Sequence, residues 1–136
     1  MMPPEEARAS IVQGWLLKAN EDFAVAEYLI SSKRPYYGAV GFHAQQAVEK
    51  YLKALLACRQ IEFPKTHDLD KLLDILACVD ETLAESLRDI TVLSVYGVET
   101  RYPADLPDLT LSEATEAVRL ATNVKDVIER AVKASD

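Results

Sequence analysis

The sequence predicts an all-α protein, an antiparallel up-and-down bundle of four to five helices. Apolar residues recur at three- and four-residue steps over long segments, which is the helical period. No segment alternates apolar and polar residues as a half-buried strand does, and neither a glycine-rich hairpin turn nor an internal repeat is present. At 136 residues and 49% hydrophobic composition, the chain suffices for one core. We therefore expect a single domain, 1–136, with its core over about residues 10–133.

The first predicted helix covers residues 5–30. Its apolar residues recur with the spacing of one helical face. They are Val12, Trp15, Leu16, Ala19, Phe23, Ala26 and Ile30. Ser32 and Pro35 mark its end, because serine competes for backbone hydrogen bonds and the residue before a proline is pushed out of the helical region. The connector to the next helix is short, which predicts antiparallel neighbours.

The second predicted helix, residues 36–60, has two sides suited to burial, so the other helices are expected to pack around it. One side is broad and apolar, with Val48, Tyr51, Leu52, Leu55 and Leu56. The opposite side carries alanines and two polar residues: His43, Ala47, Lys50, Ala54 and Ala57. The positions between the two sides are Gln45, Gln46, Glu49 and Lys53. Because alanines let a second helix approach closely, we expect both sides to contact protein.

Two shorter helices are predicted next. An N-cap residue, Thr66 or Asp68, starts a third helix near His67, and leucines follow at helical spacing. A fourth helix starts at Asp80 or Thr82. Its apolar residues are Leu83, Leu87, Ile90 and Leu93.

Residues 98–109 break the helical pattern, because they include Pro103 and Pro107 and have no repeating apolar face. A long loop in a compact helical domain is more often functional or part of an interface than idle. Thr110 and Glu113 then form a capping box that starts the last helix. The buried stripe of that helix is predicted to be Ala114, Ala117, Val118, Ala121, Val124, Ile128 and Val132.

Composition excludes several classes of protein. The net charge of -7 and pI of about 4.8 argue against DNA binding, which depends on many lysine and arginine contacts. No cationic leader followed by an apolar run is present, and no apolar run is long enough to span a membrane, so we expect a cytoplasmic protein. Cys58 and Cys78 lie in different predicted helices without metal-ligand spacing, which predicts reduced, buried or half-buried thiols and no metal site.

The candidate binding residues are polar side chains near the second helix and the long loop. The phosphate-binding and dinucleotide-binding glycine motifs and the zinc-protease and serine-hydrolase motifs are absent, so we expect no cofactor. His43, Gln46, Lys50 and Lys53 follow one edge of the second helix, His67 lies at a helix start, and Arg101 and Tyr102 lie in the loop.

His43, His67 and Arg101 each have a structural and a functional interpretation. His43 either makes one structural hydrogen bond, or it contacts a ligand or acts as a proton donor. His67 either belongs to a capping network or binds a ligand. Lys50 and Lys53 are most simply solvated helix charges. Arg101 either binds a carboxylate or phosphate through two hydrogen bonds or forms an ion pair that fixes the loop.

Together these segments resemble the HEPN domain family. The resemblance rests on Phe42 to Lys50 (FHAQQAVEK), on Pro64 with His67-Asp68-Leu69, and on Arg101-Tyr102-Pro103 after Tyr96, and it covers about residues 10–130. It implies a helical bundle that commonly dimerises and is often encoded beside a minimal nucleotidyltransferase as a toxin-antitoxin-like pair, with nucleotide binding proposed. His43, Gln46 and Lys50 would then face a groove that the Arg101 loop could cover.

Many HEPN proteins are metal-independent RNases that carry an arginine followed after four to six residues by a histidine on one helix. This chain departs from that pattern, because Pro64 separates Arg59 from His67 and Pro35 separates Arg34 from His43.

The function expected is therefore a binding module rather than an enzyme acting alone, with a nucleotide or RNA ligand or a nucleotidyltransferase partner. One alternative is a ribonuclease toxin in which His43, His67 and Arg101 form a rearranged site, and another is a purely structural interaction domain. We also expect a homodimer, formed through the long loop and the alanine-bearing helix face.

Overall fold

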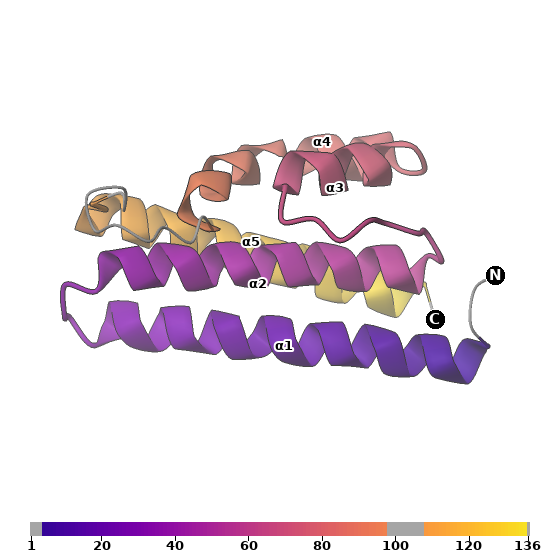
Figure 1. The fold of residues 1–136 in the computed structure, drawn as a ribbon, viewed down its shortest axis with the longest axis horizontal. Helices are drawn as coiled ribbons and strands as arrows, with labels where there is room; N and C mark the ends of the chain where they lie inside the picture. Colours follow the sequence, from indigo (N-terminus) through magenta and orange to yellow (C-terminus); the bar gives the residue numbers. More distant parts are fainter. Residues whose placement is uncertain (1–3, 98–107, 136) are drawn as a thin grey trace.

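The computed structural model describes residues 4–97 and 108–135, and within them it contains helices and no strand (Figure 1). The elements are α1 (Glu5–Ser31), α2 (Tyr37–Cys58), α3 (Leu69–Ala77), α4 (Glu81–Ser86), the 3-10 helix η1 (Arg88–Gly97) and α5 (Leu111–Ala134). Helices α1 and α2 form an antiparallel hairpin, α5 packs along α2, and the α3–η1 segment crosses over α2. The all-helical bundle that the sequence predicts is confirmed.

Helix α5 runs in the same direction as α2, and both run antiparallel to α1 (Figure 1). At the end where α2 begins, Leu109 lies close to Gly41, and a β-carbon added to Gly41 would be 3.0 Å from the Leu109 side chain. At the other end, Cys58 of α2 and Val132 of α5 line the same small cavity. This direction arises because the α3–η1 segment returns the chain to the end of the bundle where α2 begins.

Helix α2 is the centre of the core, as its two buried sides predict. Its apolar side is fully enclosed, and its alanine-bearing side is enclosed as well, with Ala47 and Ala54 at 0% exposure. Helix α1 packs on the alanine-bearing side, where Asp22 bonds to Lys50. The small alanine side chains let α1 pack closely on this side, so the protein's own helix covers it. The expectation that this side forms a dimer interface is therefore wrong.

The fourth predicted helix is in fact two elements, which corrects the sequence interpretation. Asp80 caps α4 by accepting a hydrogen bond from the Leu83 amide at 3.1 Å, but α4 ends at Ser86 and the chain continues as η1. The fully buried Leu87, Ile90 and Leu93 are three residues apart. That spacing fits the three residues per turn of a 3-10 helix, so it places Ile90 and Leu93 on one face of η1, in line with Leu87 just before it.

The helix starts at Asp68 and Thr110 agree with the sequence. Asp68 caps α3 by accepting from the Asp70 and Lys71 amides, and the capping box of Thr110 and Glu113 is complete. Cys58 is half-buried as predicted, whereas Cys78 is exposed, because it lies at the solvent-facing end of α3. Among residues 4–97 and 108–135, no helix is long and apolar enough to cross a membrane, and no cluster could hold a metal ion.

Candidate functional site

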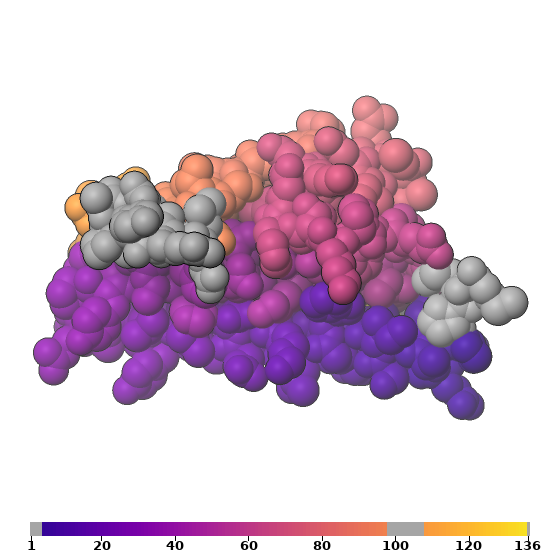
Figure 2. All heavy atoms as spheres, viewed as in Figure 1, coloured from indigo at the N-terminus to yellow at the C-terminus, as the bar shows by residue number. Residues whose placement is uncertain are grey.

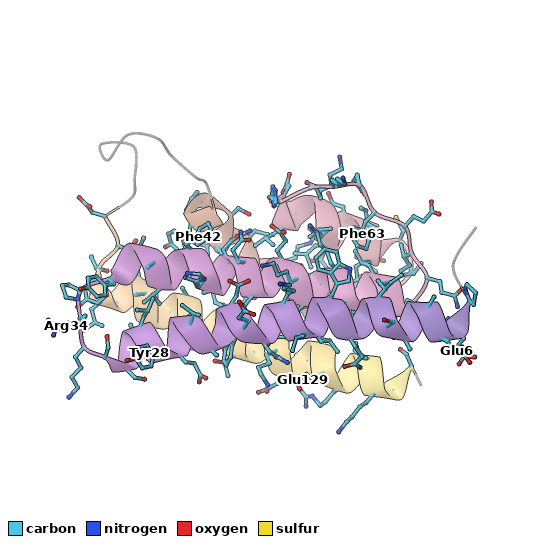
Figure 3. All side chains as sticks on the ribbon, turned by 60° about the horizontal axis from the view of Figure 1, so that its bottom comes forward. Glu6, Tyr28, Arg34, Phe42, Phe63 and Glu129 are labelled. Atoms are coloured by element: carbon cyan, nitrogen blue, oxygen red, sulfur yellow. The ribbon has the colours of Figure 1, made fainter. Side chains whose placement is uncertain are left out.

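One edge of α2 carries a network of polar side chains that we call the polar cluster. Its members come from α1, α2 and the segment before α3: Asp22, His43, Gln45, Gln46, Glu49, Lys50, Lys53 and His67. In Figure 3 the labelled Phe42, next to His43, and Phe63 lie toward the two ends of the face on which the cluster lies. Figure 2 shows the segment between α2 and α3 packed against α1 on this side of the molecule.

Asp22 of α1 organises the first part of the cluster. One of its carboxylate oxygens lies 2.9 Å from Nδ1 of His43, and the other accepts a hydrogen bond from Nζ of Lys50. The carboxylate is only 14% exposed, whereas the histidine side chain is 30% exposed. Since an ionised carboxylate only accepts hydrogen bonds, Nδ1 of His43 carries the proton, and Nε2 has no hydrogen-bond partner among the residues that the structure describes.

Glu49 of α2 organises the second part. Its carboxylate is 3% exposed and accepts from Nζ of Lys53 at 3.0 Å, while Nδ1 of His67 lies 3.0 Å away. His67 comes from the segment before α3, and its side chain is 80% exposed. The two histidines are thus held in the same way, each with Nδ1 on a carboxylate, and in the described part of the chain neither Nε2 has a partner.

Gln45 and Gln46 connect the two parts. Gln46 donates to Oε1 of Gln45 at 2.6 Å, and Gln45 approaches Oε1 of Glu49 at 3.4 Å and the His67 carbonyl at 3.5 Å. Gln45 is 1% exposed. The Gln45 carboxamide packs against Gly97 so closely that a β-carbon added to this glycine would lie only 2.4 Å from the carboxamide. The end of η1 therefore fixes the orientation of this amide.

Lys53 is the member whose position differs most from the sequence interpretation. A solvated helix charge was expected, but Lys53 is 6% exposed and Lys50 is half-buried. Besides Glu49, the ammonium group of Lys53 lies 5.3 Å from the centre of the Trp15 ring. The expectation was wrong because both lysines meet a carboxylate inside the protein, and such pairing is what allows a charged group to be buried.

The structure brings five of the predicted site residues into this one network, namely His43, Gln46, Lys50, Lys53 and His67. Arg101 and Tyr102 lie outside the described residues. The described residues on either side of them, Gly97 and Leu109, both contact α2, at Gln45 and Gly41.

Three members were missed from sequence, namely Asp22, Gln45 and Glu49. Asp22 falls within the buried stripe of α1, three residues after Ala19 and four before Ala26. A carboxylate in such a stripe needs a partner, which is the signal that could have identified it. Glu49 lies four residues before Lys53, the spacing of a helical ion pair. Nothing in the sequence indicates that this pair is buried.

Chemically, the cluster presents hydrogen-bonding groups with balanced charge. Asp22 pairs with Lys50 and Glu49 with Lys53, so the four formal charges, -2 and +2, sum to zero. The two histidines add imidazole groups to these balanced pairs. Just beyond the cluster, Tyr51 donates to Oδ1 of Asn20, and burial raises the pKa of this tyrosine, which excludes it as a proton acceptor near neutral pH.

Two solved structures resemble this chain. TT1696 from Thermus thermophilus is 29% identical, with a TM-score of 0.71 over 88% of this chain and 97% of that one. ST0689, described as an archaeal HEPN homologue, is 23% identical, with a TM-score of 0.69 over 89% of this chain and 97% of that one. The family model for the HEPN domain matches residues 12–131. The comparison with curated proteins found no match.

Proposed function

Because the chain belongs to the HEPN domain family, we propose that it is a binding module for a nucleotide-containing ligand. We further propose that it works with a minimal nucleotidyltransferase in a two-component, toxin-antitoxin-like pair. The observation that carries the proposal is the pair of accessible imidazoles, His43 and His67, along one edge of α2. His43 is oriented by the half-buried Asp22 of α1, and His67 by the buried Glu49 of α2.

This arrangement suits a phosphate group. Protonated imidazoles donate charge-assisted hydrogen bonds to phosphate oxygens, and such bonds are about twice as strong as neutral ones. The half-buried Gln46 and Lys50 add donors along the same edge. Because the lysine charges are already balanced by Asp22 and Glu49, the affinity for an anion depends on the histidines and on Arg101.

Calorimetric titration with AMP and ATP tests the binding. We expect His43→Ala and Arg101→Ala each to weaken binding by about 1.5 to 3 kcal/mol, the usual worth of a charge-assisted hydrogen bond. Lys133→Ala is the matched control, since this exposed cation lies in the last turn of α5.

Circular dichroism distinguishes a binding role from a structural one. The His43 side chain is 30% exposed, and such partly exposed polar groups contribute little to stability. If both residues act in binding, the helical signal and melting temperature of both variants should stay close to those of the wild type. Unfolded variants would make His43 and Arg101 structural residues, and unchanged affinities would remove them from the site. Co-purification with a minimal nucleotidyltransferase encoded beside this protein tests the partner.

A ribonuclease is the second candidate, favoured by the same carboxylate–histidine pairs. A carboxylate on Nδ1 orients an imidazole so that Nε2 can accept a proton, as a general base must. RNA cleavage also needs a second donor and a cation placed with similar accuracy, and this chain lacks the single-helix arginine and histidine pattern. We therefore expect the protein alone, in EDTA, to leave single-stranded RNA intact. Cleavage lost in His43→Ala, His67→Ala or Arg101→Ala would establish the ribonuclease instead.

A further inference from the structure

An open pocket of about 310 Å³ lies beside the polar cluster, at the end of the hairpin formed by α1 and α2. Its walls come from α1, the end of α2 and the segment that follows α2. The lining residues are Arg8, Ile11, Trp15, Ala57, Ile61, Glu62 and Phe63. The volume is at the lower limit for small-molecule sites, which matches a single ring system rather than a whole cofactor.

The pocket has an aromatic wall and charged groups at its edge. Trp15 and Phe63 are both partly exposed, and their ring centres are 6.3 Å apart at an angle of 58°. The side chain of Arg8 is 25% exposed, and its ion-pair partner in the described part of the chain, Glu5, is 88% exposed at 3.8 Å. An ion pair this exposed is weak, so Arg8 remains available to a ligand.

The pocket adjoins the polar cluster through the buried pair of Lys53 and Glu49. The Trp15 ring lies 5.3 Å from Nζ of Lys53, which bonds to Glu49 at 3.0 Å, and Glu49 holds His67 at 3.0 Å. These contacts make His67 the histidine nearest to the pocket, because His43 lies about 21 Å from Ala57 along α2.

We propose that this pocket binds the base of a purine nucleotide whose phosphate faces His67. This proposal rests on the function proposed above, and it adds a binding site for the base of the nucleotide. Aromatic side chains bind bases by stacking, which suits every base but favours the larger purine ring. Glu62 adds an acceptor for the N–H groups that adenine and guanine present on their edges.

Trp15 provides a direct assay, because it is the only tryptophan in the chain. We expect AMP and GMP to quench its fluorescence in a saturable manner after correction for absorption by the base. UMP should quench less, and ribose 5-phosphate, which lacks a base, should not quench. Calorimetry of the same four ligands at constant pH and ionic strength reports binding wherever it occurs on the protein.

Phe63→Leu is the test variant, since leucine keeps apolar volume in the wall and removes the aromatic face. We expect it to raise the Kd of AMP and GMP about five- to tenfold and to leave that of ribose 5-phosphate unchanged. Tyr28→Leu is the matched control, because it removes an aromatic ring that is 75% exposed elsewhere on α1 and should change neither value (Figure 3).

The outcomes separate this inference from the function on which it rests. If AMP binds by calorimetry while Trp15 fluorescence and the Phe63→Leu variant show no effect, the base lies elsewhere and only the pocket proposal fails. Ribose 5-phosphate binding as tightly as AMP would also overturn the pocket proposal, because the base would then contribute nothing. If no nucleotide binds by calorimetry, both proposals fail.

Discussion

Replacing Glu49 with glutamine should destabilise the protein much more than most single changes on a helix. Glutamine has nearly the same shape, so the change removes a charge and leaves no cavity. In the wild type, Glu49 and Lys53 are 3% and 7% exposed at the side chain and 3.0 Å apart. Glu49→Gln leaves the Lys53 ammonium buried, with a neutral amide and the Trp15 ring as its remaining contacts.

The magnitude follows from this burial. Removing one partner of a buried ion pair costs about 3 to 5 kcal/mol, because the other charge stays in a medium that solvates it poorly. The Trp15 ring offsets part of this through its interaction with the cation, which is worth about 1 kcal/mol or more when desolvated. We therefore expect the free energy of unfolding to fall by about 3 kcal/mol, and the melting temperature of a chain of this size to fall by about 10 °C.

Urea denaturation of Glu49→Gln, Lys53→Met and the double variant measures both the cost and its origin. The double variant should be more stable than the sum of the two single changes implies, since it removes both charges together. Glu129→Gln is the matched control, because the pair of Lys125 and Glu129 is 28% and 45% exposed and should contribute less than about 1 kcal/mol. If Glu49→Gln costs no more than Glu129→Gln, the buried pair does not stabilise the fold.

Three further results are expected. Gly97→Ala should lower the free energy of unfolding by about 1 to 3 kcal/mol in urea denaturation, because the new β-carbon would lie 2.4 Å from the buried Gln45 amide. Gly14→Ala is the control and should not destabilise α1, because nothing lies within 4 Å of a β-carbon at that position. The hydrogen bond from Arg59 lowers the pKa of Asp80 below its usual value of 3.8. The ionised Asp80 carboxylate therefore stabilises the fold at pH values above 3.8, and this contribution is lost as the pH falls through the lowered pKa. Asp80→Asn, which keeps an N-cap, should therefore be less stable than wild type at pH 7, with the difference closing below about pH 4 in thermal melts. Finally, we propose that the protein is a homodimer, and light scattering that returns a monomer at tens of micromolar would refute this.

The helices could be predicted from sequence because their signals are local. The apolar spacing of α1, the two buried sides of α2 and the capping box at Thr110 each lie within a few residues of one another. The split between α4 and η1 could not be predicted, because residues three apart fit both kinds of helix over one or two turns. Neither could the direction of α5, which depends on where the α3–η1 segment returns the chain.

The candidate site was predictable in its residue types but not in its connections. His43, Gln46 and Lys50 were identified because they lie on one edge of one helix. Their partner Asp22 is 21 residues from His43, and no pattern within either helix links the two. Lys53 was assigned to solvent because lysine is rarely buried, a tendency that a carboxylate on the same helix reverses here.

The position of α5 also determines the order in which the protein can fold during its synthesis. The contacts between α1 and α2 are close in sequence, so this hairpin can form as soon as both helices have emerged from the ribosome. The stripe of α5 that completes the core comes last, and its buried residues extend to Val132. Until then one apolar side of α2 lacks its final cover, and the nascent chain is at its most vulnerable to aggregation and to capture by chaperones.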